Sequence, residues 1–318
     1  MQRADGATAF ADEVGGSVIV RVGEDDPAPE PHVVASVTSV PLVVVVVAPE
    51  GPVDPGWLAL ADVMVDRGDG SLDDIAATIT THPVASTALA LLLRGQGRRT
   101  PDDGLVVESA VYSMLQAGPE FAAWRRSRPI RTHADDDGPR VRSERDGTTL
   151  RITLNRPGVR NALDARMRDE LLDALRWAAV DPDVAQVELR GEGEAFCAGG
   201  DLDEFGSRAD PATAHLIRLR YSVGRMVARL SDRTVVHLHG ACVGSGIELA
   251  AFAGTVTARE DTRVSLPELG LGLVPGAGGT VSLPARIGRL RTAWLALSGR
   301  SVDAPTAVQW GLADRLET

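Results

Sequence analysis

The first part of the chain contains three short apolar runs that predict β-strands. The clearest covers residues 42–47, which are almost entirely β-branched and have a proline on either side. Similar patterns at 17–22 and 60–65 predict partner strands, and the acidic, proline-rich stretch 24–31 predicts a loop. Together these runs indicate a small α/β layer.

From residue 71 onward the apolar positions follow the period of a helix. Ser71 is the expected N-cap, two aspartates follow in the first turn, and residues 84–93 continue the apolar pattern. Residues 105–116 and 119–126 predict two further helices. The N-terminal region is therefore expected to be part α/β layer and part helical.

A short polar linker, residues 132–140, separates this region from the rest of the chain. We expect an N-terminal region over 1–140 and a catalytic core over 141–318. In the core, strand and helix patterns alternate, which predicts right-handed crossovers and a largely parallel sheet. The predicted elements are strands at 148–154 and 184–189 and helices at 164–179 and 212–230.

The stretch 234–275 holds the residues with the most specific chemistry. Residues 235–238 show an apolar strand pattern, and the glycines that follow allow the backbone to turn tightly and expose its amides. A helix that begins near Ser245 points those N–H groups and its positive dipole end at an anion. Glu248 then lies on the first turn of the helix, and Glu268 follows twenty residues later. This arrangement suits chemistry that passes through an enolate.

Five motifs follow one another in a fixed order between residues 152 and 280. They are Ile152-Thr153-Leu154-Asn155-Arg156-Pro157 with Asn161-Ala162-Leu163, Ala195-Phe196-Cys197-Ala198-Gly199-Gly200-Asp201-Leu202, Gly244-Ser245-Gly246-Ile247-Glu248, Ser265-Leu266-Pro267-Glu268 and Leu273-Val274-Pro275-Gly276-Ala277-Gly278-Gly279-Thr280. Their combination is specific, whereas the glycine-rich turn alone is a weak signal. In this order they resemble the crotonase superfamily, whose best-known member is enoyl-CoA hydratase.

The resemblance implies a spiral of ββα units and a role for each site residue. A thioester oxygen that gains negative charge needs two fixed N–H donors, and by resemblance these belong to Gly200 and Ser245. Glu248 is expected to position and deprotonate water, and Glu268 to protonate the α carbon. The implied reaction is the syn addition of water to a 2-enoyl-CoA thioester.

Coenzyme A enters this scheme as part of the substrate, and no separate cofactor is expected. Arg160 is the side chain expected to meet a phosphate. The residues implied to bind the acyl-CoA are Arg160, Ala162, Ala198 and Gly244.

Other functions remain open at this point. They are isomerisation, hydrolysis or cofactor-free oxygenation of an acyl-CoA, and non-catalytic binding of an acyl-CoA. Isomerases of the superfamily often keep only the second carboxylate, so the presence of both Glu248 and Glu268 favours a hydratase.

His237 and His239 share a strand face, but no third ligand is spaced to complete a metal site, and no metal is expected. Ser245 lacks the spacing of a nucleophile elbow, and Asp201 is expected to cap a short helix at 202–205.

Composition restricts the partners and the compartment. The 318 residues carry a formal net charge of −11 and include no lysine, which opposes a nucleic-acid or anionic-membrane surface and leaves arginine to meet any phosphate. The most apolar stretch, 32–48, is too short and interrupted to cross a bilayer, and the acidic N-terminus lacks a signal-peptide pattern, so a cytoplasmic protein is expected. Cys197 and Cys242 are expected to be small buried residues rather than a disulfide. The resemblance implies a homo-oligomer, a trimer or a hexamer.

The helices expected between 71 and 128 resemble those that usually close a crotonase at its C-terminus. The similarity lies in 108–112 and 118–124. Residues 311–314 resemble the strand after which family members carry another helical stretch, whereas this sequence ends at Thr318. We hypothesise a circularly permuted crotonase in which the N-terminal helices pack where the C-terminal ones would. An unrelated accessory domain is the alternative.

Overall fold

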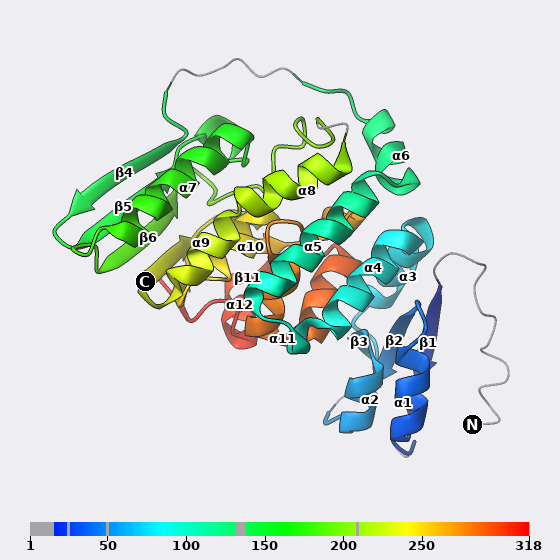
Figure 1. Ribbon diagram of the computed structural model, residues 1–318. Coiled ribbons are helices and arrows are strands. Elements are labelled where there is room, and N and C mark those ends of the chain that lie inside the picture. The colour runs from blue at the N-terminus through cyan, green and yellow to red at the C-terminus, as the bar shows by residue number, and fades with distance from the viewer. Residues whose placement is uncertain (1–15, 24–25, 49–50, 132–137, 208–209, 318) are drawn as a thin grey trace.

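The computed structural model describes residues 16–23, 26–48, 51–131, 138–207 and 210–317 (Figure 1). The strands that the argument below uses form three sheets. They are β1 (Ser17–Arg21), β2 (Val43–Ala48), β3 (Val63–Asp66), β4 (Val141–Asp146), β5 (Thr149–Leu154), β6 (Gln186–Gly191), β7 (Thr234–Leu238), β8 (Ala241–Val243), β9 (Thr255–Ala258), β10 (Arg263–Ser265), β11 (Val302–Asp303) and β12 (Arg315–Leu316).

Helices fill the segments between these strands. They are α1 (Pro31–Thr38), α2 (Pro55–Leu60), α3 (Ser71–Thr81), α4 (Pro83–Arg94), α5 (Pro101–Gln116), α6 (Pro119–Ser127), α7 (Ala165–Val180), α8 (Pro211–Arg220), α9 (Val223–Arg229), α10 (Ser245–Ala250), α11 (Gly279–Ser298) and α12 (Ala304–Trp310). Short 3₁₀ helices are η2 (Gln96–Arg98), η3 (Pro157–Val159), η4 (Ser231–Arg233) and η5 (Glu268–Leu271).

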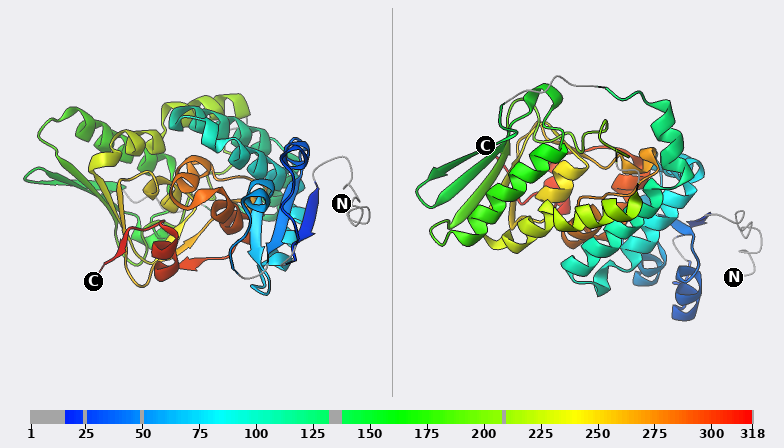
Figure 2. Two further views of the ribbon diagram at one scale, coloured as in Figure 1. Left: turned by 90° about the horizontal axis from the view of Figure 1, so that it is seen from below. Right: turned by 45° about the horizontal axis from the view of Figure 1, so that its top comes forward.

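The largest sheet runs in the order β12-β9-β7-β6-β5-β4. All its neighbouring strands are parallel except β4, which is antiparallel to β5. A second sheet has the order β11-β10-β8, and the third, β1-β2-β3, is parallel throughout. The predicted α/β fold with a mostly parallel sheet is confirmed. Figures 1 and 2 show the β1-β2-β3 sheet at the opposite end of the molecule from β4, β5 and β6.

Most predicted elements have the expected positions. The differences described next concern three expected elements and one strand, β4, that the sequence did not predict. Helix α2 occupies the start of the strand expected at 60–65, because Asp54 caps the helix through the N–H of Gly56 and Pro55 opens it. The helix expected at 212–230 is two helices, since the Ser222 hydroxyl accepts from the N–H of Arg225 and begins α9 afresh.

The other two differences concern a cap and an edge strand. Ser71 is the first residue of α3 rather than its N-cap, because the carboxylate of Asp69 accepts the Ser71 N–H at 2.6 Å. Strand β4 has no apolar alternation and buries only Val141, so its sequence pattern gives no strand signal. Residues 132–137 of the expected linker lie outside the described residues.

The N-terminal sheet shares its core with the rest of the molecule. One face, which includes Val44 and Val46, packs against α1, α2 and Leu290 of α11. The opposite face, which includes Val43 and Val45, belongs to the large core cluster that continues through α3, α4 and α11 into the six-stranded sheet. The apolar cores on either side of residue 140 are therefore continuous.

Helix α5 crosses the middle of the molecule, and α6 continues from its end at the upper right of the view (Figure 1). Helix α5 packs on α8, α9 and α11, and α6 packs on η5. Residues from 101 to 127 thus cover elements of the second half of the chain. No single helix in the described ranges is long and apolar enough to cross a membrane, although the pair 71–81 and 83–98, bent by 110°, passes that test when taken together.

Candidate functional site

The loop from 191 to 201 has its shape because a buried asparagine holds it. Asn161 adopts a positive φ of 55°, which Asn tolerates better than most residues. Its side-chain amide donates to the carbonyl oxygens of Glu192 at 2.9 Å and Ala195 at 2.8 Å, and its side-chain oxygen accepts the N–H of Arg156 at 2.8 Å. These bonds fix the loop that leads to Gly200.

The backbone N–H groups of Gly200 and Ser245 have no hydrogen-bond partner among the described residues. Leu163 pairs with the backbone of Gly199 and Asp201, at 2.8 and 3.0 Å, which directs the N–H of Gly200 away from that pairing. Ser245 is the first residue of α10, so its N–H has no acceptor one turn earlier. Both residues line the same cavity. These N–H groups are free to bind an oxyanion.

Glu248 lies on the first turn of α10 and is buried. Its Oε2 accepts the N–H groups of Ala277 at 2.7 Å and Gly279 at 2.8 Å, while no described residue donates to its Oε1. Burial raises the pKa of the Glu248 carboxyl to about 7, and the hydrogen bonds from the two N–H groups lower it only in part. One carboxylate oxygen is therefore anchored and the other remains available to a ligand.

Glu268 begins η5 and is also buried. Its Oε2 has no hydrogen-bond partner among the described residues, and its Oε1 lies against the backbone of Gly244. Burial, and then the charge of Glu248, raise the pKa of the Glu268 carboxyl well above its ordinary value. This environment favours the neutral acid.

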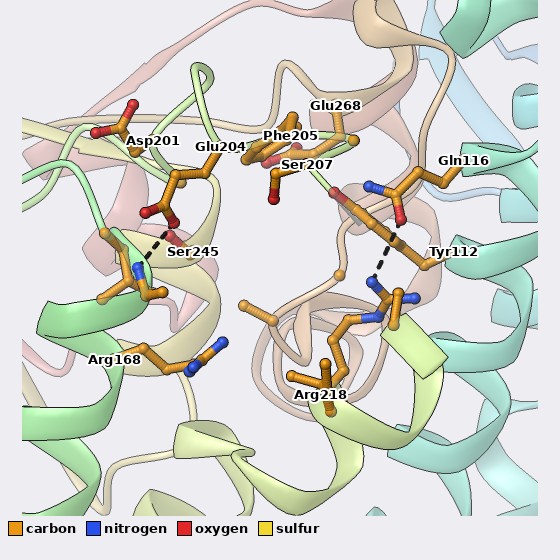
Figure 3. Close-up of a pocket in the computed structure, with 18 of the residues that line it drawn as sticks. Tyr112, Gln116, Arg168, Asp201, Glu204, Phe205, Ser207, Arg218, Ser245 and Glu268 are labelled. Carbon is orange, nitrogen blue, oxygen red and sulfur yellow. Dashed lines mark hydrogen bonds between the residues drawn. The ribbon is translucent and has the colours of Figure 1, made fainter. Parts of the chain in front are cut away.

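A cavity of about 450 Å³ joins these groups. Figure 3 shows Arg168 of α7 on one side of it and Tyr112, Gln116 and Arg218 on the other. Of the residues expected at the site, the cavity is lined by Gly200, Ser245, Glu248 and Glu268. Such a volume is in the usual range for a site that binds a small molecule.

The four residues implied to bind the acyl-CoA lie around the cavity but not on its wall. The carbonyl of Arg160 accepts the N–H of Ala198 at 2.9 Å, which joins two of these segments, and the Arg160 side chain is exposed. Ala162 is half-buried, and Gly244 lies behind Glu268.

Helix α5 adds residues that the sequence motifs did not indicate. Tyr112 and Gln116 line the cavity, and Glu108 binds the loop that holds Glu248. A signal was present, because Leu105, Glu108 and Tyr112 share the buried face of the helix, where a glutamate is unusual. Arg168 and Arg218 were also missed. Arg218 stacks on the Tyr112 ring, with its guanidinium carbon 4.6 Å from the ring centre.

The remaining candidates have structural partners. Asp201 pairs with Arg156 at 3.1 Å and accepts the N–H of Asp203, but residues 202–206 form a turn rather than the expected helix. His237 contacts Glu317, and His239 contacts the carbonyl of residue 193 at 3.1 Å.

Cys197 and Cys242 are buried free thiols, as expected. Their backbones lie side by side and pair as a single parallel β-bridge. No group of three or more His, Cys, Asp or Glu in the described part of the chain is placed to hold a metal ion.

A family model described as enoyl-CoA hydratase/isomerase matches residues 149–317, which is more than half of the chain. The chain belongs to the enoyl-CoA hydratase/isomerase family. Its fold is that of the crotonase superfamily, as the resemblance implied.

Solved and curated members of this family agree with the assignment. The chain is 35% identical over 168 residues to a 2,3-dehydroadipyl-CoA hydratase of Escherichia coli K12, a match that covers 53% of this chain and 65% of the relative. The crystal structure of an enoyl-CoA hydratase from Thermoplasma volcanium matches with a TM-score of 0.53 and 32% identity, over 57% of this chain and 72% of that one. A family structure from Thermobifida fusca, solved with acetoacetyl-CoA, matches with a TM-score of 0.52 and 29% identity, over 56% and 73%.

Proposed function

We propose that this family member is an enoyl-CoA hydratase, which adds water in syn geometry across the double bond of a 2-enoyl-CoA thioester. The observation that carries the proposal is the meeting of two free N–H groups and two buried carboxyl groups on one cavity. A binding protein without activity has no need of two buried acids, because burying ionisable groups costs free energy.

The N–H groups of Gly200 and Ser245 bind the thioester oxygen. Water attacks the β carbon and gives its proton to the carboxylate of Glu248, and the electron pair of the double bond moves onto the thioester oxygen as an enolate. The enolate then collapses as the carboxyl of Glu268 delivers its proton to the α carbon. Fixed donors at the enolate oxygen stabilise the transition state more than the ground state, and each contributes roughly 10² to 10³ in rate.

The surroundings of the two carboxyl groups support their different roles. Glu248 accepts two N–H bonds, which favour its charged form, whereas Oε2 of Glu268 has no donor among the described residues. A base must be charged and an acid must be neutral before reaction, so environments that separate two carboxyl groups in this way indicate the assignment.

The substrate class rests on the relatives. The Escherichia coli relative is named for a 2-enoyl thioester, and the Thermobifida protein was solved with an acyl-CoA. We place the coenzyme A end near Arg160, Ala162 and Ala198, with the exposed Arg160 side chain meeting a phosphate. The chain spans 65% of the Escherichia coli relative's length, and we propose that α5 and α6 serve here as the closing helices that the family usually carries at its C-terminus.

The test is to incubate the protein with crotonyl-CoA and with longer and aromatic 2-enoyl-CoAs. Hydration removes the conjugated-thioester absorbance, and product analysis separates hydration from migration of the double bond. Glu248→Gln and Glu268→Gln are each expected to lower kcat by about 10²-fold or more, since each removes a proton-transfer group.

Glu170→Gln is the control, because this carboxylate of α7 pairs with Arg166 outside the cavity. Hydration that persists in both active-site variants refutes the roles. Tight acyl-CoA binding with an unchanged spectrum for every thioester refutes the hydratase.

A further inference from the structure

Four successive N–H groups at the start of α11 are divided between two buried carboxylates. Ala277 and Gly279 donate to Oε2 of Glu248. Gly278 donates to Oε1 of Glu108 at 2.7 Å, and Thr280 donates to Oε2 of Glu108 at 2.8 Å. The loop is thus held from both sides, by α10 and by α5.

Glu108 is bound more completely than Glu248. The hydroxyl of Thr280 also donates to its Oε2, at 2.7 Å, so both of its oxygens are occupied. Its side chain is buried, and it reaches the loop from a part of the chain about 170 residues away in sequence. A buried carboxylate with three donors is a costly feature unless its bonds fix something specific.

The bonds of Glu108 determine where the Glu248 carboxylate lies. The donors of Glu248 alternate with those of Glu108 along one short segment, so the two sets cannot shift independently. If the segment moved, Ala277 and Gly279 would no longer anchor Oε2 of Glu248, and its Oε1 would lose its place at the cavity. A misplacement of about 1 Å at a reacting group can cost roughly 10²-fold in rate.

We propose that Glu108 of α5 is a positioning residue of the site, which holds the 277–280 segment so that Glu248 presents one carboxylate oxygen to the acyl-CoA. This inference rests on the proposed function. The site then includes a residue from the N-terminal region, outside the part of the chain that the family model matches.

Glu108 also acts on the site through its charge. Burial, and then the charge of Glu248, raise the pKa of the Glu108 carboxyl to about 8, and Glu108 in turn contributes to the raised pKa of Glu268. The titratable and charged groups around Glu108 are Glu248 of α10, Glu268 of η5, Tyr112 of α5, Arg218 of α8 and Arg168 of α7.

The test compares Glu108→Gln with Glu120→Gln. Glu120 of α6 also holds the start of a helix, since it accepts the N–H groups of Val84 and Ala85 at 2.8 and 3.1 Å, but it lies outside the active-site cavity. A glutamine keeps the size of either side chain and cannot accept at both ends. Both variants are therefore expected to melt at a lower temperature than the wild type.

Only Glu108→Gln is expected to change the chemistry. For crotonyl-CoA its kcat should fall at least about tenfold while KM changes less than about threefold, since the group that moves is a proton acceptor rather than a binding surface. Above about pH 8 the Glu108 carboxyl is ionised, and its charge raises the pKa of Glu268. Glu108→Gln removes that charge, so the basic limb of the pH profile should move to lower pH. Thr280→Val, which removes one bond to Glu108 and keeps its charge, should give a smaller loss of kcat and leave that limb in place.

A kcat for Glu108→Gln within twofold of the wild type overturns the inference. A loss that only follows the folded fraction, as in Glu120→Gln, also overturns it. The titration of the Glu268 carboxyl by ¹³C NMR, without substrate, should show a lower midpoint in Glu108→Gln, and an unmoved midpoint counts against the inference. If the wild type hydrates no enoyl-CoA, the proposed function fails, and this titration still decides whether Glu108 acts on the pair.

Discussion

Gly244→Ala adds a single methyl group at the position where the backbone passes the second carboxylate. Gly244 has φ 49° and ψ −122°, a conformation that residues with a side chain rarely adopt. A Cβ built there would lie 2.2 Å from Oε1 of Glu268. That separation is far below van der Waals contact, so either the carboxyl group or the backbone has to move.

The expected cost has two parts. Backbone strain of this kind costs about 1–3 kcal/mol, which should appear in the free energy of unfolding. Displacement of the Glu268 carboxyl should remove proton delivery to the α carbon, and general acid catalysis typically contributes about 10² to 10⁴ in rate. The loss of rate should therefore exceed what the loss of stability explains.

The assay pairs urea unfolding with crotonyl-CoA hydration at a temperature where the variant is folded. Gly270→Ala is the matched control, because Gly270 lies in η5 beside Glu268, has no positive φ, and has no atom within 4 Å of a built Cβ. We expect the control to hydrate at close to the wild-type rate. Should Gly244→Ala stay folded and hydrate as fast as the control, the placement of Glu268 against the reacting carbons is wrong.

Three further predictions concern the pH dependence of activity, the pH dependence of stability and a buried group of ion pairs. The wild-type kcat/KM should rise as pH increases through about 7, because burial raises the pKa of Glu248 to that value and the base must be ionised; a pH profile that is flat from 5 to 8 contradicts this. The pKa of Glu108 is likewise raised in the folded protein, from 4.5 to about 8. Its contribution to the free energy of unfolding is therefore complete below the pKa of the unfolded chain and is lost as the pH rises toward about 8. Urea titrations between these two pH values should show the wild type losing stability relative to Glu108→Gln. Arg156→Met should lower the free energy of unfolding by about 3–5 kcal/mol, because it leaves the buried carboxylate of Asp201 without the arginine 3.1 Å away and removes one of the two arginines paired with Asp164, which keeps Arg140 at 3.3 Å. A loss under 1 kcal/mol would show that these ion pairs are not buried in solution.

The pattern of apolar residues predicted many of the strands and helices from the sequence. The all-apolar run at 42–47 is a buried strand, and the helix expected at 164–179 is α7, which Asp164 caps through the N–H of Met167. The break between α8 and α9 could not be read, since the apolar period continues across it and only the hydroxyl cap at Ser222 restarts the helix. Periodicity records which face is buried, and it does not record where one helix ends and a second begins on the same face.

The sequence by itself determined the placement of residues that lie within a single short segment. Ser245 begins α10 and Glu248 lies on its first turn, so neighbouring residues specify both positions. The loop that leads to Gly200 depends instead on Asn161, which is 34 residues from Ala195 in the sequence. Only the tertiary structure decided that Glu108 belongs beside Glu248, because its partners lie about 170 residues away and no local pattern relates α5 to the start of α11. A glutamate on a buried helix face predicts that some group donates hydrogen bonds to it, but only the packing of the chain determines which backbone amides those donors are.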